Sequence, residues 1–220
     1  MYLPLGSGVV STLELLRDVR AIVFDVGETL VDESRAWAEL AEMAGVTPLT
    51  LAGVLGAVIE RGEHHNRVWD VLDVAKPAKA PIIRGVDLYP DALECLRAVR
   101  HAGLIVGIAG NQPAGAEAEL RASGFEADFI ASSAEWGVSK PSPEFFSRVI
   151  ESSRTSPEHI VYVGDRLDND VLPARALGMQ TILIRRGPWG YLHAQRPDAI
   201  LATARIDTLA EITSAVATRI

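Results

Sequence analysis

Ala-Ile-Val-Phe-Asp-Val-Gly-Glu-Thr-Leu, residues 21–30, is the stretch that decides the fold of this chain. A short, β-rich apolar run leads directly into the acidic Asp25 and, two positions later, into Gly27. A buried strand that is followed at once by polar residues is typical of a parallel sheet, where ligand sites lie beyond the carboxyl ends of the strands. Asp25 is therefore the first candidate for a functional side chain.

Short apolar runs alternate with helical patterns along most of the remaining chain. The expected strands are Ala21–Asp25, Leu104–Ala109, Asp128–Ala131, Ile160–Gly164 and Gln180–Ile184, with a further edge strand at Asp198–Leu201. The expected helices are Asp91–His101, Pro113–Ser123, Pro143–Ser152 and a closing helix at Leu209–Ile220. This alternation predicts the α/β class, with a Rossmann-like parallel sheet.

Residues 34–88 break the alternation, because three helical patterns follow one another with no strand between them. These patterns are Ser34–Ala44, Pro48–Glu60 and His64–Val74, and the linker Ala75–Pro81 follows them. We expect a helical cap at 34–88, inserted into a catalytic core made of 1–33 and 89–220. The cap is expected to open and close over the site.

Composition restricts the partners of the chain. A formal net charge of −8 argues against broad binding to nucleic acid or to an anionic membrane surface. Cys95 is the only cysteine, so an intrachain disulfide is excluded, and no apolar run approaches the roughly 18 residues of a membrane span. We expect a cytoplasmic monomer or homodimer that acts on a small molecule.

Polar residues lie at or near the ends of several expected strands. Besides Asp25 these are Gly110 and Asn111, Lys140, Gly164 and Asp165, and the downstream Asn169 and Asp170. Each pattern by itself also has a structural explanation. An aspartate can cap a turn, Lys-Pro is common at solvated surfaces, and an acidic run can stabilise a helix N-terminus.

Taken in order, these residues supply the groups that phosphoryl transfer through an aspartyl-phosphate needs. A divalent cation held by Asp25 and Asp165 would offset the repulsion between a carboxylate nucleophile and a phosphate dianion. Lys140 would add a fixed positive charge. Backbone N–H groups around Gly110 and Asn111 could bind the phosphoryl oxygens.

The ordered motifs resemble those of the haloacid dehalogenase superfamily. Its pattern runs Asp-x-Asp-x-Thr, Ser/Thr-Asn, Lys-Pro and Gly-Asp-x-x-x-Asn-Asp, and the resemblance spans residues 21–187. The matching positions are Asp25, Thr29, Asn111, Lys140, Gly164, Asp165, Asn169 and Asp170. The inserted helices also lie where that family has a helical cap.

This resemblance implies a phosphatase of small phosphorylated metabolites in which Asp25 is the nucleophile. It implies Mg²⁺ bound by the side chains of Asp25 and Asp165 and by the main-chain carbonyl of Gly27. Lys140 would orient the nucleophile and the phosphoryl group. Asp170 would position Lys140 or the waters of the metal.

Two positions depart from the family pattern. Gly27 stands where the phosphatases have a second Asp that protonates the leaving group, a step worth about 10²–10⁴-fold in rate. Glu28, Asp32 and Glu33 lie nearby in sequence as candidates for a replacement acid. Gly110 stands where the family has a Ser or Thr hydroxyl.

Aromatic and charged residues elsewhere favour structural interpretations. A cluster in the inserted helices, comprising Arg61, Glu63, His64, His65 and Arg67, is expected to form a solvated helix face rather than to contact a substrate. Trp37 and Trp69 are expected in the core of the cap. The segment 185–191, after the last main strand, is expected to be a surface loop.

Two alternatives remain open from the residues, and the order of the motifs argues against a third. A 2-haloacid dehalogenase would use Asp25 without needing an acid at position 27, although it would not need the acidic pair Asp165 and Asp170. A receiver-type signalling module shares Lys-Pro and an acceptor aspartate, but the order of its motifs is different. A descendant that binds a phosphorylated ligand without catalysis is also compatible with both departures.

Overall fold

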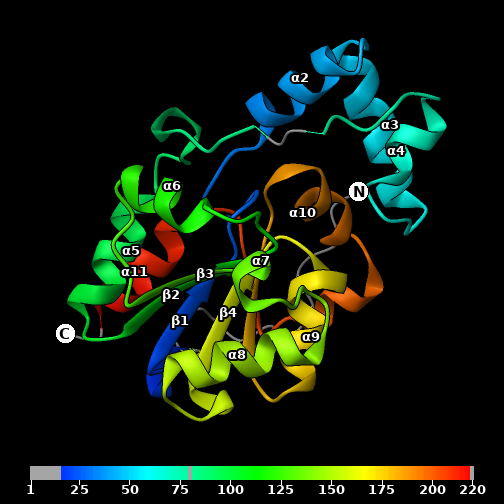
Figure 1. Cartoon of the computed structure of the whole chain (residues 1–220). Helices are drawn as coiled ribbons and strands as arrows, with labels where there is room; N and C mark the ends of the chain where they lie inside the picture. The colour runs from blue at the N-terminus through cyan, green and yellow to red at the C-terminus, as the bar shows by residue number, and fades with distance from the viewer. Residues whose placement is uncertain (1–15, 79–80, 219–220) are drawn as a thin grey trace.

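The computed structural model describes residues 16–78 and 81–218. Six parallel strands form one sheet: β1 (Ala21–Phe24), β2 (Ile105–Gly110), β3 (Phe129–Ser132), β4 (Ile160–Gly164), β5 (Gln180–Ile184) and β6 (Ala204–Ile206). Their order across the sheet is β3-β2-β1-β4-β5-β6, so β1 is flanked by β2 and β4 (Figure 1). The strand order therefore reverses at β1, which is where open parallel sheets place their ligands.

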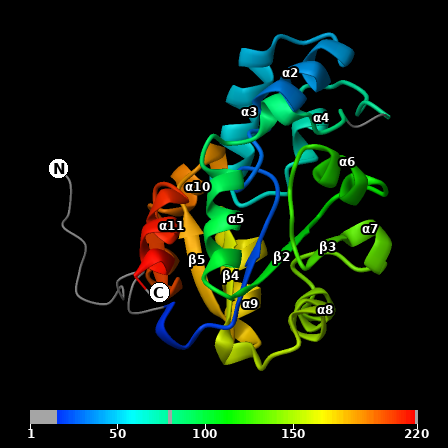
Figure 2. The same cartoon turned by 90° about the vertical axis from the view of Figure 1, so that its left-hand side faces the viewer.

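Helices cover both faces of the sheet, because successive strand residues point to opposite sides. In β1, Ile22 and Phe24 pack in a core with α5 (Ala92–His101) and α11 (Ala210–Ala217). Ala21 and Val23 belong to the opposite core, where the aromatic residues of α8 (Pro143–Ser153) pack beside α9 (Leu172–Ala176). Figure 2 shows α5 and α11 on one side of the sheet and α8 on the other.

The remaining short helices lie between successive strands, except for one that precedes β1. They are α6 (Ala116–Ala122), α7 (Ser133–Trp136), α10 (Gly187–His193), the 3-10 helices Leu16–Asp18, Gly85–Asp87, Pro157–His159 and Pro197–Leu201, and a π-helical turn at Leu167–Val171. Local capping sets several of these boundaries. At the start of α8, for example, the Ser142 hydroxyl accepts the Glu144 N–H and Pro143 occupies the first helical position.

Three helices are inserted between β1 and β2: α2 (Ser34–Met43), α3 (Pro48–Glu60) and α4 (Arg67–Val71). Both views place them beyond the carboxyl ends of the strands (Figures 1 and 2). They have a core of their own, which includes Leu51, Val58 and Trp69 and also takes in Trp189 of α10. The insertion is thus packed against the part of the chain that follows β5.

No single helix among the described residues is long and apolar enough to cross a membrane. The helices α2 and α3 would together have that length and composition, but a bend of 110° separates them.

The predicted fold class is confirmed, and two strands, β4 and β5, have the predicted bounds. The edge strand predicted at Asp198–Leu201 is wrong: Pro197 begins a 3-10 helix there, and the edge strand is Ala204–Ile206. The helix predicted at His64–Val74 forms only over Arg67–Val71.

Two further helix predictions differ at their ends. The pattern Pro113–Ser123 becomes helical only at Ala116, after Gly115 takes a left-handed φ of 92°. Of the predicted closing helix, 210–217 is helical, and residues 219–220 lie outside the described residues.

Candidate active site

The fold brings the predicted motifs together at the carboxyl ends of the central strands. Asp25 directly follows β1, Asn111 directly follows β2, and Asp165 directly follows β4. Because β2, β1 and β4 are neighbours, these side chains gather at the reversal of strand order. Lys140 reaches the same place from the loop that precedes α8.

Lys140 lies between two carboxylates. Its Nζ atom is 2.6 Å from Oδ1 of Asp25 and 2.6 Å from Oδ1 of Asp170, and only 1% of its side chain is exposed. Burial by itself lowers the pKa of Lys140, but the charges of Asp170 and Asp25 outweigh burial and raise this pKa well above its usual value. The ammonium group is therefore a fixed positive charge beside Asp25.

Asn111 holds the backbone of Lys140. Its Oδ1 accepts the Lys140 N–H at 2.8 Å, and its Nδ2 donates to the Lys140 carbonyl at 2.9 Å. The side chain thus forms a two-point bridge between the end of β2 and the Lys-Pro loop. The expected phosphoryl contact at Asn111 is through its backbone N–H, which this side-chain bridge leaves unaffected.

Three carboxylates form a candidate cation site. Asp25, Asp165 and Asp170 each offer an oxygen, and these oxygens lie within 4.8 Å of one another. Oδ2 of Asp165 is buried without a hydrogen-bond partner among the described residues. Burial, followed by the charges of Asp170 and Asp25, raises the pKa of Asp165 well above its usual value. Clustered oxygen ligands with one unsatisfied acceptor fit a hard divalent cation such as Mg²⁺.

Gly164 makes room for Asp170. A Cβ atom at residue 164 would lie 2.4 Å from Oδ2 of Asp170, so only glycine fits beside that carboxylate. The same oxygen accepts the Arg166 N–H at 3.0 Å, and Asp170 is completely buried. Asp170 is therefore held by the backbone N–H of Arg166 on one oxygen and by Lys140 on the other.

A close contact with a carboxylate also explains the glycine at position 110. A Cβ atom there would lie 2.7 Å from Oδ1 of Asp25 and 3.2 Å from Cγ2 of Val26. The hydroxyl-bearing residue of the family pattern has no room in this arrangement. The absence of that hydroxyl is thus tied to the place that the Asp25 carboxylate occupies.

The three acids near Gly27 have different surroundings. Glu28 receives the Tyr89 hydroxyl at 2.6 Å and the Glu33 N–H at 3.1 Å, and Asp32 accepts the N–H of the first residue of α2 at 2.8 Å. All three acids line the cavity, and the Glu33 carboxyl receives the Trp37 indole N–H at 3.4 Å. Burial first, and then the charges of Glu28 and Asp25, raise the pKa of Glu33 to about 7.

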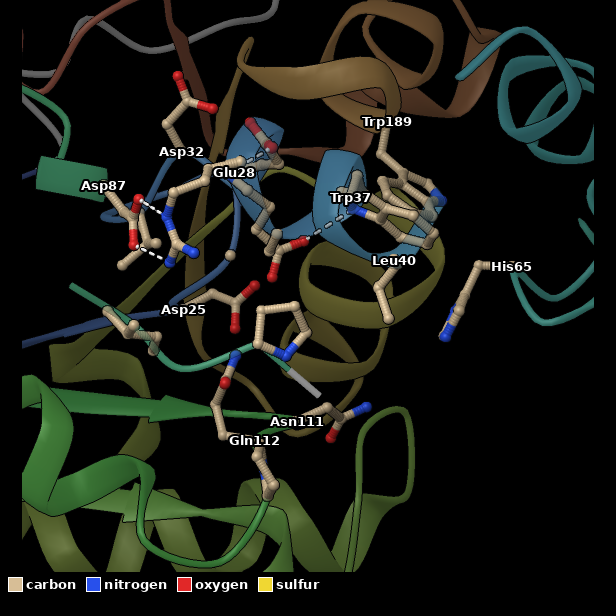
Figure 3. A pocket seen from close by; sticks show the side chains of 18 of the residues that line it. Asp25, Glu28, Asp32, Trp37, Leu40, His65, Asp87, Asn111, Gln112 and Trp189 are labelled. Carbon is tan, nitrogen blue, oxygen red and sulfur yellow. Dashed lines mark hydrogen bonds and ion pairs between the residues drawn. The ribbon is translucent and has the colours of Figure 1, made fainter. Parts of the chain in front are cut away.

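A cavity of about 480 Å³ lies between the strand ends and the inserted helices. Its floor includes Asp25, Asn111, Lys140 and Asp165. The surrounding apolar and aromatic side chains include Trp37, Leu40, His65 and Trp69 from the insertion and Trp189 from α10. Figure 3 shows Trp37, His65 and Trp189 grouped on one side of the cavity and Asp25 and Asn111 on another.

The expectations for the insertion are met only in part. Arg61, His64 and Arg67 are exposed, as predicted, but His65 lines the cavity with its ring 6.4 Å from that of Trp37. Burial, followed by the charge of His64, lowers the pKa of His65 to about 4, so a neutral ring faces the cavity.

The expected surface loop at 185–191 is wrong. Residues 187–193 form α10, and Trp189 is 6% exposed because it packs against the inserted helices. The sequence carried a usable signal for this helix, since Gly187-Pro188 is a typical start in which proline takes the first helical turn. Trp69 is in the core of the insertion, as predicted, and Trp37 packs against that core; both also line the cavity.

Known proteins agree with this architecture. A model of the haloacid dehalogenase-like hydrolase family matches residues 19–178. A protein from Methanopyrus kandleri named glyceraldehyde 3-phosphate phosphatase is 30% identical over 83% of this chain and 91% of its own length. A protein of the same name from Methanocaldococcus jannaschii is 28% identical over 78% of this chain and 87% of its own length.

Solved structures share the fold. A phosphatase of this superfamily from Thermococcus onnurineus superposes with a TM-score of 0.59 at 23% identity, covering 89% of this chain and 97% of that one. A structure described as a dehalogenase gives a TM-score of 0.66 at 20% identity, covering 89% and 96%. The family and the hydrolase class predicted from the ordered motifs are confirmed. The chain belongs to the haloacid dehalogenase-like hydrolase family and is a hydrolase of the phosphatase type.

Proposed function

We propose that this protein is a Mg²⁺-dependent phosphatase of small phosphate esters, which works through an aspartyl-phosphate on Asp25. The observation that carries the proposal is the pairing of Lys140 with both Asp25 and Asp170 at 2.6 Å, next to the unpartnered oxygen of Asp165. A nucleophilic carboxylate, a fixed cation and a candidate metal site thus converge at one point of the sheet.

The side chains of Asp25 and Asp165, with the main-chain carbonyl of Gly27, would hold the cation, and Asp170 would position Lys140 or metal-bound waters. When bound, Mg²⁺ would neutralise the charge of the phosphoryl group and hold it against the nucleophile. Gly27 lines the same cavity as the two carboxylates. The buried cluster therefore has the composition that a hard cation prefers.

The residues of the chain perform the bond changes. A carboxylate oxygen of Asp25 attacks phosphorus, and the bond from phosphorus to the ester oxygen breaks, so that its electron pair leaves with that oxygen. Lys140 holds the Asp25 carboxylate in place, and it offsets the negative charge of the phosphoryl oxygens. Water then cleaves the aspartyl-phosphate, which restores Asp25 and releases inorganic phosphate.

The cavity supports a small substrate. Its volume of about 480 Å³ suits a phosphorylated metabolite rather than a macromolecule. The two relatives named glyceraldehyde 3-phosphate phosphatase support the same size class. Trp37, Leu40 and the neutral His65 present an apolar wall, so the carbon skeleton of the ester would face the inserted helices.

We further propose that residues 34–88 act as a cap over a core made of 1–33 and 89–220, and that this cap opens and closes during turnover. The position of α2, α3 and α4 beyond the strand ends supports that role (Figure 1). A closed cap would exclude water from the aspartyl-phosphate until the leaving group has departed.

The cellular setting is proposed on composition. The net charge of −8 supports a protein that binds neither nucleic acid nor anionic membrane, and the single cysteine suits the cytoplasm. We propose a monomer or homodimer in that compartment.

The test is a screen of phosphomonoesters and 2-haloacids, with and without Mg²⁺, using Asp25→Asn as the blank. The matched control is Asp198→Asn, an exposed aspartate away from the cavity. Wild-type and control should release phosphate only with Mg²⁺, and Asp25→Asn should release none. Phosphate release that persists in Asp25→Asn would contradict the nucleophile. Metal-independent halide release would establish the dehalogenase alternative, and binding of phosphate without any turnover would establish a non-catalytic descendant.

A further inference from the structure

The space next to Gly27 is occupied by the carboxyl group of Glu33. A Cβ atom built on Gly27 would lie 2.5 Å from Oε1, 2.7 Å from Cδ and 3.2 Å from Oε2 of Glu33. All the heavy atoms of that carboxyl group therefore stand where a side chain at position 27 would begin. In the family pattern this side chain is the aspartate that serves the leaving group.

A tight turn after β1 delivers Glu33 to this place. The Val26 carbonyl accepts the N–H groups of Leu30 and Val31 at 2.9 and 3.0 Å, and the Glu28 N–H bonds the Val31 carbonyl at 2.7 Å. Gly27 and Val31 consequently lie side by side as a β-bridge. The chain has thus folded back over Gly27 by the time it reaches Glu33.

The Glu33 side chain does not cap the N-terminus of α2. Glu33 is the N-cap residue of α2, but its carboxyl makes no capping hydrogen bond. The Trp37 indole, one turn into α2, instead holds Oε2 at 3.4 Å, as the dashed line in Figure 3 shows. The Glu28 carboxyl fixes the Glu33 backbone N–H at 3.1 Å. The Glu28 contact fixes the backbone and the Trp37 contact holds the side chain, whose carboxyl lies in the cavity next to Gly27.

The other two acids near Gly27 also line the cavity, but their carboxylates are held by other hydrogen-bond partners. Glu28 is held by Tyr89 at 2.6 Å, and Asp32 accepts the Ser34 N–H at 2.8 Å at the start of α2. Glu33 is therefore the acid of this turn whose carboxyl fills the site of the missing side chain.

We propose that Glu33 is the proton donor and acceptor of this phosphatase, replacing the aspartate that is absent at Gly27. The inference rests on the proposed aspartyl-phosphate chemistry at Asp25 and adds the group that serves the leaving alcohol. The carboxyl comes from a position six residues after Gly27 in the chain but occupies the same part of the cavity.

Glu33 transfers one proton in each of the two steps. As Asp25 bonds to phosphorus and the ester bond breaks, the electron pair on the ester oxygen takes the proton of the Glu33 carboxyl, and the alcohol leaves. The Glu33 carboxylate then takes a proton from water while the water oxygen bonds to phosphorus. The bond from phosphorus to Asp25 breaks with its electron pair returning to that carboxylate, and inorganic phosphate leaves.

The first experiment compares two esters in the full-length protein with Mg²⁺. An alkyl phosphate has a weakly acidic alcohol and needs a proton donor, whereas a nitrophenyl phosphate releases a stable phenolate without one. In Glu33→Gln we expect kcat/KM to fall about 10²–10⁴-fold on the alkyl phosphate and much less on the nitrophenyl ester. A burst of nitrophenol should also appear, because water can no longer be deprotonated in the second step.

The matched control is Glu42→Gln, an exposed acid on α2 that does not line the cavity and should behave as wild-type. The second variant exchanges the two positions. Glu33→Ala should lose alkyl phosphatase activity, and the double variant Gly27→Asp with Glu33→Ala should recover part of it, because the space next to residue 27 is then free.

Two further sets of results would contradict the role of Glu33. Equal losses on both esters in Glu33→Gln, or no loss on either, together with no recovery in the double variant, overturn the role of Glu33 while wild-type turnover leaves the proposed function intact. A wild-type protein that hydrolyses neither ester overturns the proposed function and this inference together.

Discussion

Gly110 and Asp25 touch so closely that a Cβ atom on the glycine would lie 2.7 Å from Oδ1 of the carboxylate. That same oxygen is the one that Lys140 contacts at 2.6 Å. A side chain at residue 110 would therefore have to displace the Asp25 carboxylate from the position in which Lys140 holds it.

Gly110→Ser should consequently lower activity, even though it restores the residue type of the family pattern. The added atoms should push Asp25 away from Lys140, and a misplacement of about 1 Å can cost about 10²-fold in rate. Measurement of kcat on a phosphate ester checks this, with Gly53→Ser as the control because a Cβ at residue 53 meets no other atom within 4 Å. A more active Gly110→Ser would show that the Asp25 carboxylate can move without loss.

Lys140 should contribute strongly to stability as well as to activity. Lys140→Met would leave Asp25 and Asp170 buried without their cation, and removal of one partner of a buried ion pair typically costs about 3–5 kcal/mol. Denaturant unfolding in metal-free buffer measures this loss, and Lys76→Met, at an exposed lysine, is the control. If both variants unfold at the same denaturant concentration, the ion-pair cluster is not stabilising.

Mg²⁺ should stabilise the wild-type protein through Asp165. Binding to the folded state alone adds about 2.7 kcal/mol at roughly one hundred times Kd, so the unfolding temperature should rise with Mg²⁺. In Asp165→Asn this rise should vanish. Without metal this variant should be at least as stable as wild-type, because a buried carboxyl next to Asp25 and Asp170 has been neutralised.

Thermal unfolding with and without Mg²⁺ tests this prediction independently of catalysis, with Asp198→Asn as the exposed control. An unchanged Mg²⁺ response in Asp165→Asn would place the cation elsewhere.

His193 should make the fold sensitive to acid. Its Nδ1 accepts the Leu167 N–H at 3.0 Å, and burial lowers the pKa of His193 from 6.5 to about 4. The unfolded chain therefore takes up this proton near pH 6.5 and the folded protein only near pH 4. Between these values the unfolded state binds more protons, so the free energy of unfolding is largest above pH 6.5 and decreases as the pH falls toward 4.

His193→Asn should flatten this part of the pH dependence, because the asparagine amide can accept the Leu167 N–H without titrating. The free energy of unfolding, measured at several pH values between 4 and 7.5, provides the comparison with wild-type. His101→Asn, at an exposed position, should keep the wild-type slope. The same slope in His193→Asn would assign the acid sensitivity to other groups.

Much of the fold was predictable from the sequence because strand and helix signals are local. The bounds of β4, β5 and α3 follow from short patterns of apolar residues, glycine and proline. The edge strand of the sheet was not predictable from such local patterns. Asp198–Leu201 has a strand-like composition, but Pro197 begins a 3-10 helix and pairing with β5 falls to Ala204–Ile206.

The candidate site, like the fold, was only partly predictable from the sequence. The order of Asp25, Asn111, Lys140, Asp165 and Asp170 along the chain determined the family and predicted that these residues meet, since the carboxyl ends of parallel strands share one edge. The sequence also showed that Gly27 and Gly110 depart from the family pattern, but it left both departures unexplained.

Only the tertiary structure decided what occupies the spaces next to those two glycines. The Asp25 carboxylate fills the space next to Gly110, and the Glu33 carboxyl fills the one next to Gly27. Sequence spacing could not choose among Glu28, Asp32 and Glu33, because all three are acidic and close to Gly27. In the folded chain Tyr89 holds Glu28, and the turn after β1 and the Trp37 contact place Glu33 next to Gly27. Close packing lets only one group occupy that volume.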